Sequence, residues 1–123
     1  MAGLENVDEM FDLRMSEGAK SLFEKVKAFI KDEVEPITLE FHQLGADRED
    51  RWSYAPEQLE LLEGVKAKAK AMGLWNFFLP DDATGQGLSN LDYAYIATEL
   101  GKNPLASECL NCAAPDTGNM EVL

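Results

Sequence analysis

Two cysteines and one histidine are the residues best suited to metal or redox chemistry. Cys109 and Cys112 are separated by two residues, a spacing that can chelate zinc or form a redox pair. A second pair of ligands is absent, because His42 is the only histidine in the sequence. Free cysteines in an apolar helix usually behave as small hydrophobic side chains. We therefore expect both thiols to be reduced and to bind no metal.

The remaining residues that could form a site carry weaker signals. Gly85-Gln86-Gly87 follows no convincing strand and lacks the wider dinucleotide fingerprint, so it predicts a tight turn before a helix. Asp81-Asp82 lacks the spacing of a Ca²⁺ loop and indicates a solvated loop. His42 has no nucleophile in a recognisable motif and is expected at the surface or in packing. Four aromatic residues are expected in the core rather than as a cofactor platform: Trp52, Trp75, Phe77 and Phe78.

Hydrophobic periodicity predicts the helices that must position these residues. Ser16 is expected to cap the first helix, with its hydroxyl accepting a backbone N–H. Pro36 is expected to kink this helix, and Gly45 to Arg51 to form a charged loop. A second helix begins near Pro56 and stops at Gly73. The expected apolar stripes are Ala19, Leu22, Phe23, Val26, Phe29, Ile30, Val34, Ile37, Leu39 and Phe41, then Leu59, Leu62, Val65, Ala69 and Met72.

The second half of the chain predicts shorter elements. Leu74 to Leu79 is interpreted as a buried connection. Ser89, with Asp92 three residues later, resembles a capping box before a third helix that ends at Gly101 and buries Tyr93, Ile96, Ala97 and Leu100. A fourth helix is expected from Leu105 to Ala113, stopped by Pro115. After it come a turn at residues 116–119 and the first turn of another helix at 120–123. The fold class is all-α, a compact helical bundle of four or more helices.

Composition limits the partners. The net charge of −12, from 23 acidic and 11 basic residues, disfavours nucleic acid and anionic membrane surfaces. No apolar run approaches the roughly 20 residues that span a bilayer, and the first residues lack the features of a secretory signal. We expect an intracellular, soluble protein, with cytoplasmic, mitochondrial and peroxisomal locations left open. Residues 1–15 are interpreted as an acidic arm, and residues 16–123 as one helical domain.

The sequence resembles the N-terminal helical domain of the acyl-CoA dehydrogenases. The resemblance is carried by Met72 to Asp82, by Gly85 to Asn90, and by the helix from Tyr93 to Glu99, whose Glu99 matches a family glutamate. The segment Asn111 to Glu121 is similar to the next family segment in a subgroup of larger, less typical members. One departure is Thr84-Gly85, where the family often has two adjacent glycines.

The resemblance implies a function that this chain only partly supplies. Such enzymes bind FAD mainly through a β-rich middle domain and a C-terminal helical bundle, and they oxidise acyl-CoA thioesters between the α and β carbons. The catalytic glutamate of the family lies beyond residue 123, so no catalytic residue is expected in this chain. The N-terminal domain supplies one wall of the acyl pocket, for which the candidates by position are Leu110, Ala113, Ala114 and Thr117.

Two hypotheses follow for the whole molecule. In the first, the apolar, uncapped end at residues 120–123 indicates a domain truncated from an FAD-dependent dehydrogenase, with acyl-CoA and the missing domains as partners. The alternative is a stand-alone helical interaction module without catalytic activity. In either case the chain alone is expected to bind no FAD tightly and to expose an apolar face that can drive self-association.

Overall fold

The structure is a computed structural model that describes residues 12–79, 81–83 and 85–123. The first eleven residues of the expected arm, Pro80, and Thr84 of the glycine turn lie outside the described residues. Every regular element in the described ranges is a helix, and no strand occurs among them. The all-α fold class predicted from the periodicity is therefore confirmed.

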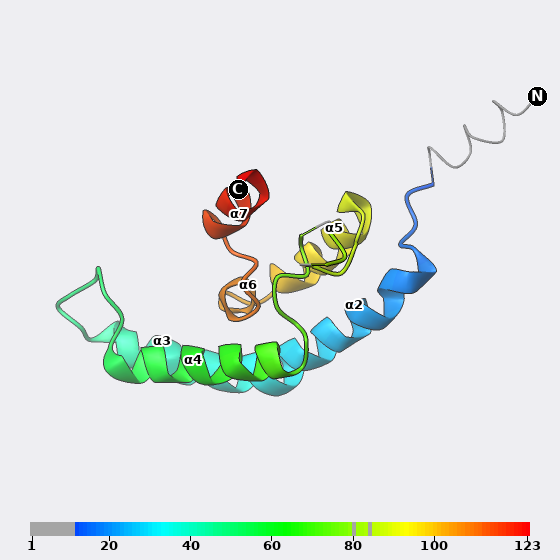
Figure 1. Cartoon of the computed structure of the whole chain (residues 1–123). Helices are drawn as coiled ribbons and strands as arrows, with labels where there is room; N and C mark the ends of the chain where they lie inside the picture. The colour runs from blue at the N-terminus through cyan, green and yellow to red at the C-terminus, as the bar shows by residue number, and fades with distance from the viewer. Residues whose placement is uncertain (1–11, 80, 84) are drawn as a thin grey trace, which may run out of the picture.

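One long, bent helix forms the base of the molecule (Figure 1). Helix α2 (Glu17–Phe29) continues through a π-helical turn, η1 (Ile30–Val34), into α3 (Glu35–Ala46). The Glu35 N–H donates to the Ile30 carbonyl, five residues back, directly before Pro36 removes the next donor. The expected kink at the proline is confirmed, and the helix runs to Ala46 rather than stopping at Gly45.

Helix α4 (Pro56–Ala71) returns beside α3, and Gly73 stops it, as predicted. Gly73 has a φ of 71°, its N–H donates to the Lys70 carbonyl, and the Leu74 N–H donates to the Ala69 carbonyl. This is a Schellman motif, which favours glycine at the left-handed position. The buried face of α4 consists of Gln58, Leu62, Val65 and Ala69.

Several predicted stripe positions are wrong. Leu59 and Met72 on α4 are exposed, because the buried face is rotated toward Gln58. Gln58 is satisfied there: its Nε2 donates to the Phe41 carbonyl at 2.9 Å and its Oε1 accepts the Ala55 N–H. Leu39 on α3 is also exposed. Periodicity predicts an apolar stripe on a helix, but it does not predict which part of that stripe a neighbouring helix covers.

The connection at residues 74–79 is buried as expected, with Leu74, Phe77 and Phe78 in the core. Helix α5 (Asn90–Leu100) follows, and Ser89 caps it by accepting the Asp92 N–H at 3.1 Å. The prediction that Ser16 caps α2 with its side chain is wrong. Its hydroxyl instead donates to Asp92, which lies on α5.

The last elements are shorter or earlier than expected. Helix α6 is limited to Ala106–Cys109, because Asn111 adopts a φ of 54° and ends it before the predicted limit at Ala113. The predicted turn at 116–119 is instead the first part of α7 (Asp116–Val122).

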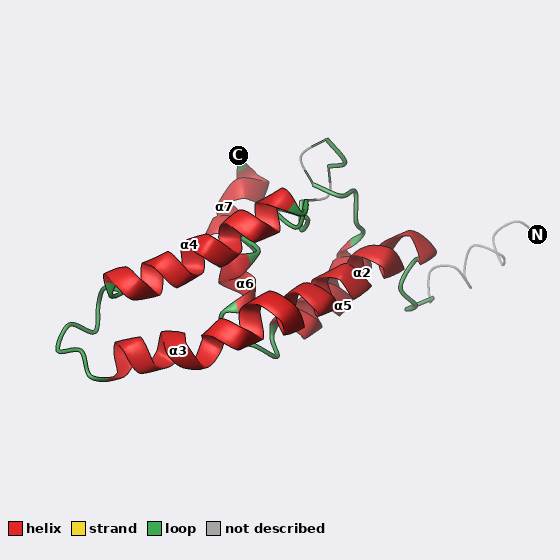
Figure 2. Cartoon of the chain, turned by 90° about the horizontal axis from the view of Figure 1, so that it is seen from below, coloured by secondary structure: helices red, strands yellow, loops and turns green. Residues whose placement is uncertain are grey.

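Helix α6 lies at the centre of the bundle, in contact with α4, α5 and η1 (Figure 2). Its buried residues, Ala106 and Cys109, join a core to which every helix except α7 contributes buried side chains. The remaining buried core residues are Val26, Phe29, Ile30, Val34, Phe41, Leu62, Val65, Ala69, Leu74, Phe77, Phe78, Ile96, Leu100, Leu105, Leu110 and Cys112.

One expected core aromatic is not in the core. Trp52 lies in the loop between α3 and α4 and is 98% exposed. The loop backbone is fixed locally, since the Trp52 N–H donates to Asp50. Trp75 is half-buried, with the Lys70 ammonium 4.4 Å from the centroid of its ring. Of the four aromatics, only Phe77 and Phe78 are fully enclosed.

Candidate functional site

The four candidate wall residues lie along the path from α6 to α7. Leu110 is completely buried in the core, where it anchors this path to the bundle. Ala113 and Thr117 are partly exposed, and Ala114 is exposed. The Thr117 N–H donates to the Ala113 carbonyl at 3.3 Å, so this bond joins the segment before α7 to the first turn of that helix. Only the last three residues present side chains near the surface.

The two cysteines are buried free thiols in and directly after α6. Burial raises the pKa of Cys109 to about 11 and the pKa of Cys112 to about 12. Helix α6 contains Cys109 alone, because Asn111 ends the helix before Cys112. Metal ligation and nucleophilic attack require the thiolate, which these surroundings disfavour.

We expect neither thiol to react readily in the folded protein. At pH 8, a chromogenic disulfide reagent should label both cysteines at least ~100-fold more slowly in the native chain than in denaturant, because both thiols are protonated and enclosed. Rapid labelling of the native chain, or one zinc per chain that is lost on Cys109→Ser, would contradict this assignment. The matched control is Ser53→Cys, which places a thiol in the exposed loop beside Trp52.

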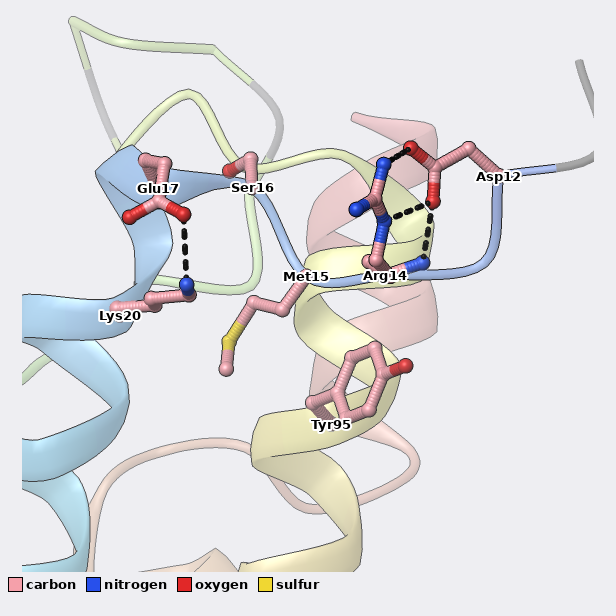
Figure 3. A pocket seen from close by; sticks show the side chains of 7 residues that line it. All are labelled: Asp12, Arg14, Met15, Ser16, Glu17, Lys20 and Tyr95. Atoms are coloured by element: carbon pink, nitrogen blue, oxygen red, sulfur yellow. Dashed lines mark hydrogen bonds and ion pairs between the residues drawn. The ribbon is translucent and has the colours of Figure 1, made fainter. Parts of the chain in front are cut away.

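An open cleft of about 690 Å³ lies where the chain enters α2 (Figure 3). Its charged side chains are paired with one another: Arg14 Nη2 lies 2.8 Å from Asp12, and Lys20 Nζ lies 2.6 Å from Glu17. Hydrogen bonds from Arg14 lower the pKa of Asp12 to about 2. Because both cations already have an anionic partner, an anionic ligand in this cleft would have to compete with that partner.

Asp92 joins the entry of α2 to α5, which sequence reasoning missed. Its two carboxylate oxygens accept the Ser16 N–H and the Ser16 hydroxyl, each at 2.8 Å. Nearby, the Tyr95 hydroxyl donates to the Leu13 carbonyl. Burial acts to raise the pKa of Asp92, but the hydrogen bonds from Ser16 and Ser89 outweigh it and lower that pKa. The capping-box pattern predicted the local bond to Ser89 but not this contact across 76 residues.

Sequence reasoning also missed a contact between two asparagines. Asn111 Nδ2 donates to Asn76 Oδ1 at 2.5 Å, and both residues have positive φ, 54° and 58°. Asparagine tolerates the left-handed region better than most residues, which is the one signal the sequence offered. The other singled-out residues remain at the surface: His42, Asp81 and Asp82 are exposed. In the ranges that the structure covers, no group of three or more His, Cys, Asp or Glu side chains can hold a metal ion.

Comparison with known proteins agrees with this architecture. The family model described as "Acyl-CoA dehydrogenase, N-terminal domain" matches residues 16–118, most of the chain. The chain belongs to the acyl-CoA dehydrogenase family. It is 44% identical over 116 residues to acyl-CoA dehydrogenase family member 10 of Mus musculus and 49% identical over 102 residues to family member 11 of Gallus gallus.

This dehydrogenase domain corresponds to a small part of its relatives. It covers 89% of its own length but 10% of the mouse protein, and 80% of its length but 12% of the chicken protein. A solved chain from Mycobacterium abscessus, assigned to the acyl-CoA dehydrogenases, matches with a TM-score of 0.73 and 42% identity over 89% of this chain and 28% of that chain.

The glycine turn does not present the Gly85 N–H to a ligand. The pyrophosphate of the cofactor needs free backbone N–H groups or cations. In the glycine turn, the Gly85 N–H donates to the Asp81 carbonyl at 2.7 Å, and a Cβ on Gly85 would meet the Leu79 carbonyl oxygen at 2.1 Å. Gly85 therefore serves a close backbone approach within the chain. The cations of the cleft in Figure 3 are likewise paired.

In the part of the chain that is described, no helix is long and apolar enough to cross a membrane.

Proposed function

We propose that this domain is part of an FAD-dependent acyl-CoA dehydrogenase that desaturates acyl-CoA thioesters between the α and β carbons. The match of the family model to residues 16–118 carries this proposal. The net charge of −12 disfavours binding of the phosphates of FAD, and the cations of the cleft already have anionic partners. Both observations support the proposal that other parts of the complete enzyme bind the cofactor. In this proposal the domain contributes shape rather than a catalytic group.

The proposed contribution is one wall of the acyl pocket, formed by Ala113, Ala114 and Thr117. Two small alanines before α7 and a threonine in its first turn leave room for an apolar chain, and they are at least partly exposed. Leu110, the fourth candidate, is completely buried and is therefore not proposed to line the pocket itself. Apolar side chains with a few polar groups are typical of pockets that bind small ligands.

A domain transplant tests the proposal. The matching segment of the Mycobacterium abscessus dehydrogenase is replaced by residues 16–123 of this chain, which share its fold at a TM-score of 0.73. The hybrid should be yellow, and acyl-CoA should reduce its flavin. The 123-residue chain alone should be colourless and should reduce no dye on addition of acyl-CoA, because in this proposal the flavin site and the catalytic base belong to other parts of the complete enzyme.

Substitutions in the hybrid locate the wall. Ala114→Trp should lower kcat/KM for a long-chain acyl-CoA by about tenfold or more, because the indole occupies the proposed pocket. Gly18→Ala on α2 is the control, since a Cβ there meets nothing within 4 Å. A stand-alone interaction module predicts a hybrid without flavin reduction, and stoichiometric flavin on the isolated chain would show that the cofactor site is misplaced.

A further inference from the structure

We infer that Asn76 and Asn111 form a positioning pair that fixes the path of residues 113–117. This inference rests on the proposed pocket wall, and it assigns the residues that hold the wall in place. Asn111 Nδ2 donates to Asn76 Oδ1 at 2.5 Å, and the same nitrogen lies 3.8 Å from Met120 Sδ on α7. The side chain of Asn111 thereby contacts elements on both sides of the wall segment.

The backbone at Asn111 shows why the side chain matters. The Asn111 N–H donates to the Glu108 carbonyl and the Cys112 N–H donates to the Ser107 carbonyl, so α6 ends in a Schellman motif with Asn111 at the left-handed position. Glycine is the residue usually found there, because it has no Cβ. Helix geometry alone would therefore favour glycine at this position.

Gly73 provides an internal comparison. It occupies the same position in the Schellman motif that ends α4, with a φ of 71° and nothing within 4 Å of an added Cβ. At Asn111 the chain instead carries a side chain, and that side chain reaches across the fold. The end of α6 thus differs from the end of α4 in having a partner, Asn76, for a side-chain amide at the left-handed position.

Asn76 completes the pair from the connection after α4. It has a φ of 58° and is partly buried, and its carbonyl accepts the Leu79 N–H. Phe77 and Phe78, the next two residues, are held in the core. The wall segment is therefore tied through one amide pair to the buried connection that follows α4. Two left-handed asparagines joined by their side chains are favoured only where the surroundings hold both.

The first test uses amide hydrogen exchange in the full chain. Asn111→Gly keeps the left-handed backbone and removes the amide, so exchange at Thr117 and Asn119 should become about tenfold faster while the centre of α4 is unchanged. Asn76→Gly should have the same effect, and the double variant should be no faster than either single variant, because all three lack one hydrogen bond. Unchanged exchange at Thr117 would overturn the inference.

The polarity of the bond gives a sharper comparison. Asn76→Asp keeps an acceptor for Asn111 Nδ2 and should stay close to the parent, whereas Asn111→Asp removes the donor and should match Asn111→Gly. The control is Asn90→Ala, which changes an exposed asparagine at the start of α5 and leaves both readout positions unaltered. Equal effects of the two aspartates would contradict the assigned donor and acceptor.

The second test uses the hybrid enzyme. Asn111→Gly should raise the KM for acyl-CoA about threefold to tenfold, with kcat changed less than about twofold and flavin content equal to the parent hybrid. Faster exchange in the chain with an unchanged KM in an active hybrid would overturn the positioning role. An inactive parent hybrid would instead contradict the proposed function, while the exchange comparison still decides whether the pair holds the segment.

Discussion

Replacing Phe77 by alanine should lower the free energy of unfolding by about 3–5 kcal/mol, the largest effect that we expect from a single substitution in this chain. The Phe77 side chain is completely buried, and its ring lies 6.3 Å from that of Tyr93 on α5. Truncation removes the apolar contacts and leaves a cavity that the surrounding helices fill only in part. Urea denaturation followed by far-ultraviolet circular dichroism measures the change.

Trp52→Ala is the matched control for this experiment. Both aromatics were expected in the core, but Trp52 is 98% exposed, so its loss should change the unfolding free energy by less than about 0.5 kcal/mol. If Phe77→Ala does not fold, the milder Phe77→Leu retains most of the apolar volume and should cost about 1 kcal/mol. Equal costs at positions 52 and 77 would contradict the packing described above.

The second large effect is expected at Asp92. Asp92→Ala removes both acceptors of Ser16 and should lower the free energy of unfolding by about 2–4 kcal/mol at pH 7, since hydrogen bonds to a buried charged group exceed ordinary ones. Asp92→Asn keeps one acceptor and can donate to the Ser16 hydroxyl, so it should cost less than the alanine. Asp12→Asn is the control, because Asp12 is exposed and its partner Arg14 is a neighbour in sequence.

The effect at Asp92 should depend on pH in a defined direction. The pKa of Asp92 is lowered in the fold from its ordinary value of 3.8, so its ionised form stabilises the native state above that value. This contribution is lost as the pH falls below 3.8 and through the folded pKa. The stability gap between the parent and Asp92→Asn should therefore narrow in acid, and a gap that widens there would rule out this account.

Local signals in the sequence predicted local structure well. Gly73 and Ser89 mark helix ends through bonds to residues within five positions, so glycine and serine there are nearly sufficient to specify the caps. The bend at Pro36 follows from the missing donor. The family resemblance located the domain through the order of several such segments.

Features that depend on distant partners were not predictable in this way. Ser16 resembles a helix cap, but its hydroxyl is used by Asp92, 76 residues away. Asn111 ends α6 early because it adopts a left-handed backbone, which asparagine permits but does not demand. The wall candidates came from the resemblance alone, and nothing in their residue types distinguishes a pocket lining from helix packing.

The π-helical turn at residues 30–34 keeps two apolar faces in phase. Phe29 and Phe41 are twelve positions apart, which in a regular α-helix would place them about 120° apart around the axis. A π-helical turn is equivalent to one inserted residue, which reduces the difference to about 20°. Both rings accordingly lie in one core, although the helix is bent between them. A relative that lacks one residue of this turn would form an uninterrupted α-helix with both apolar faces still directed to the core. A one-residue gap in an alignment at this turn is therefore compatible with the same packing.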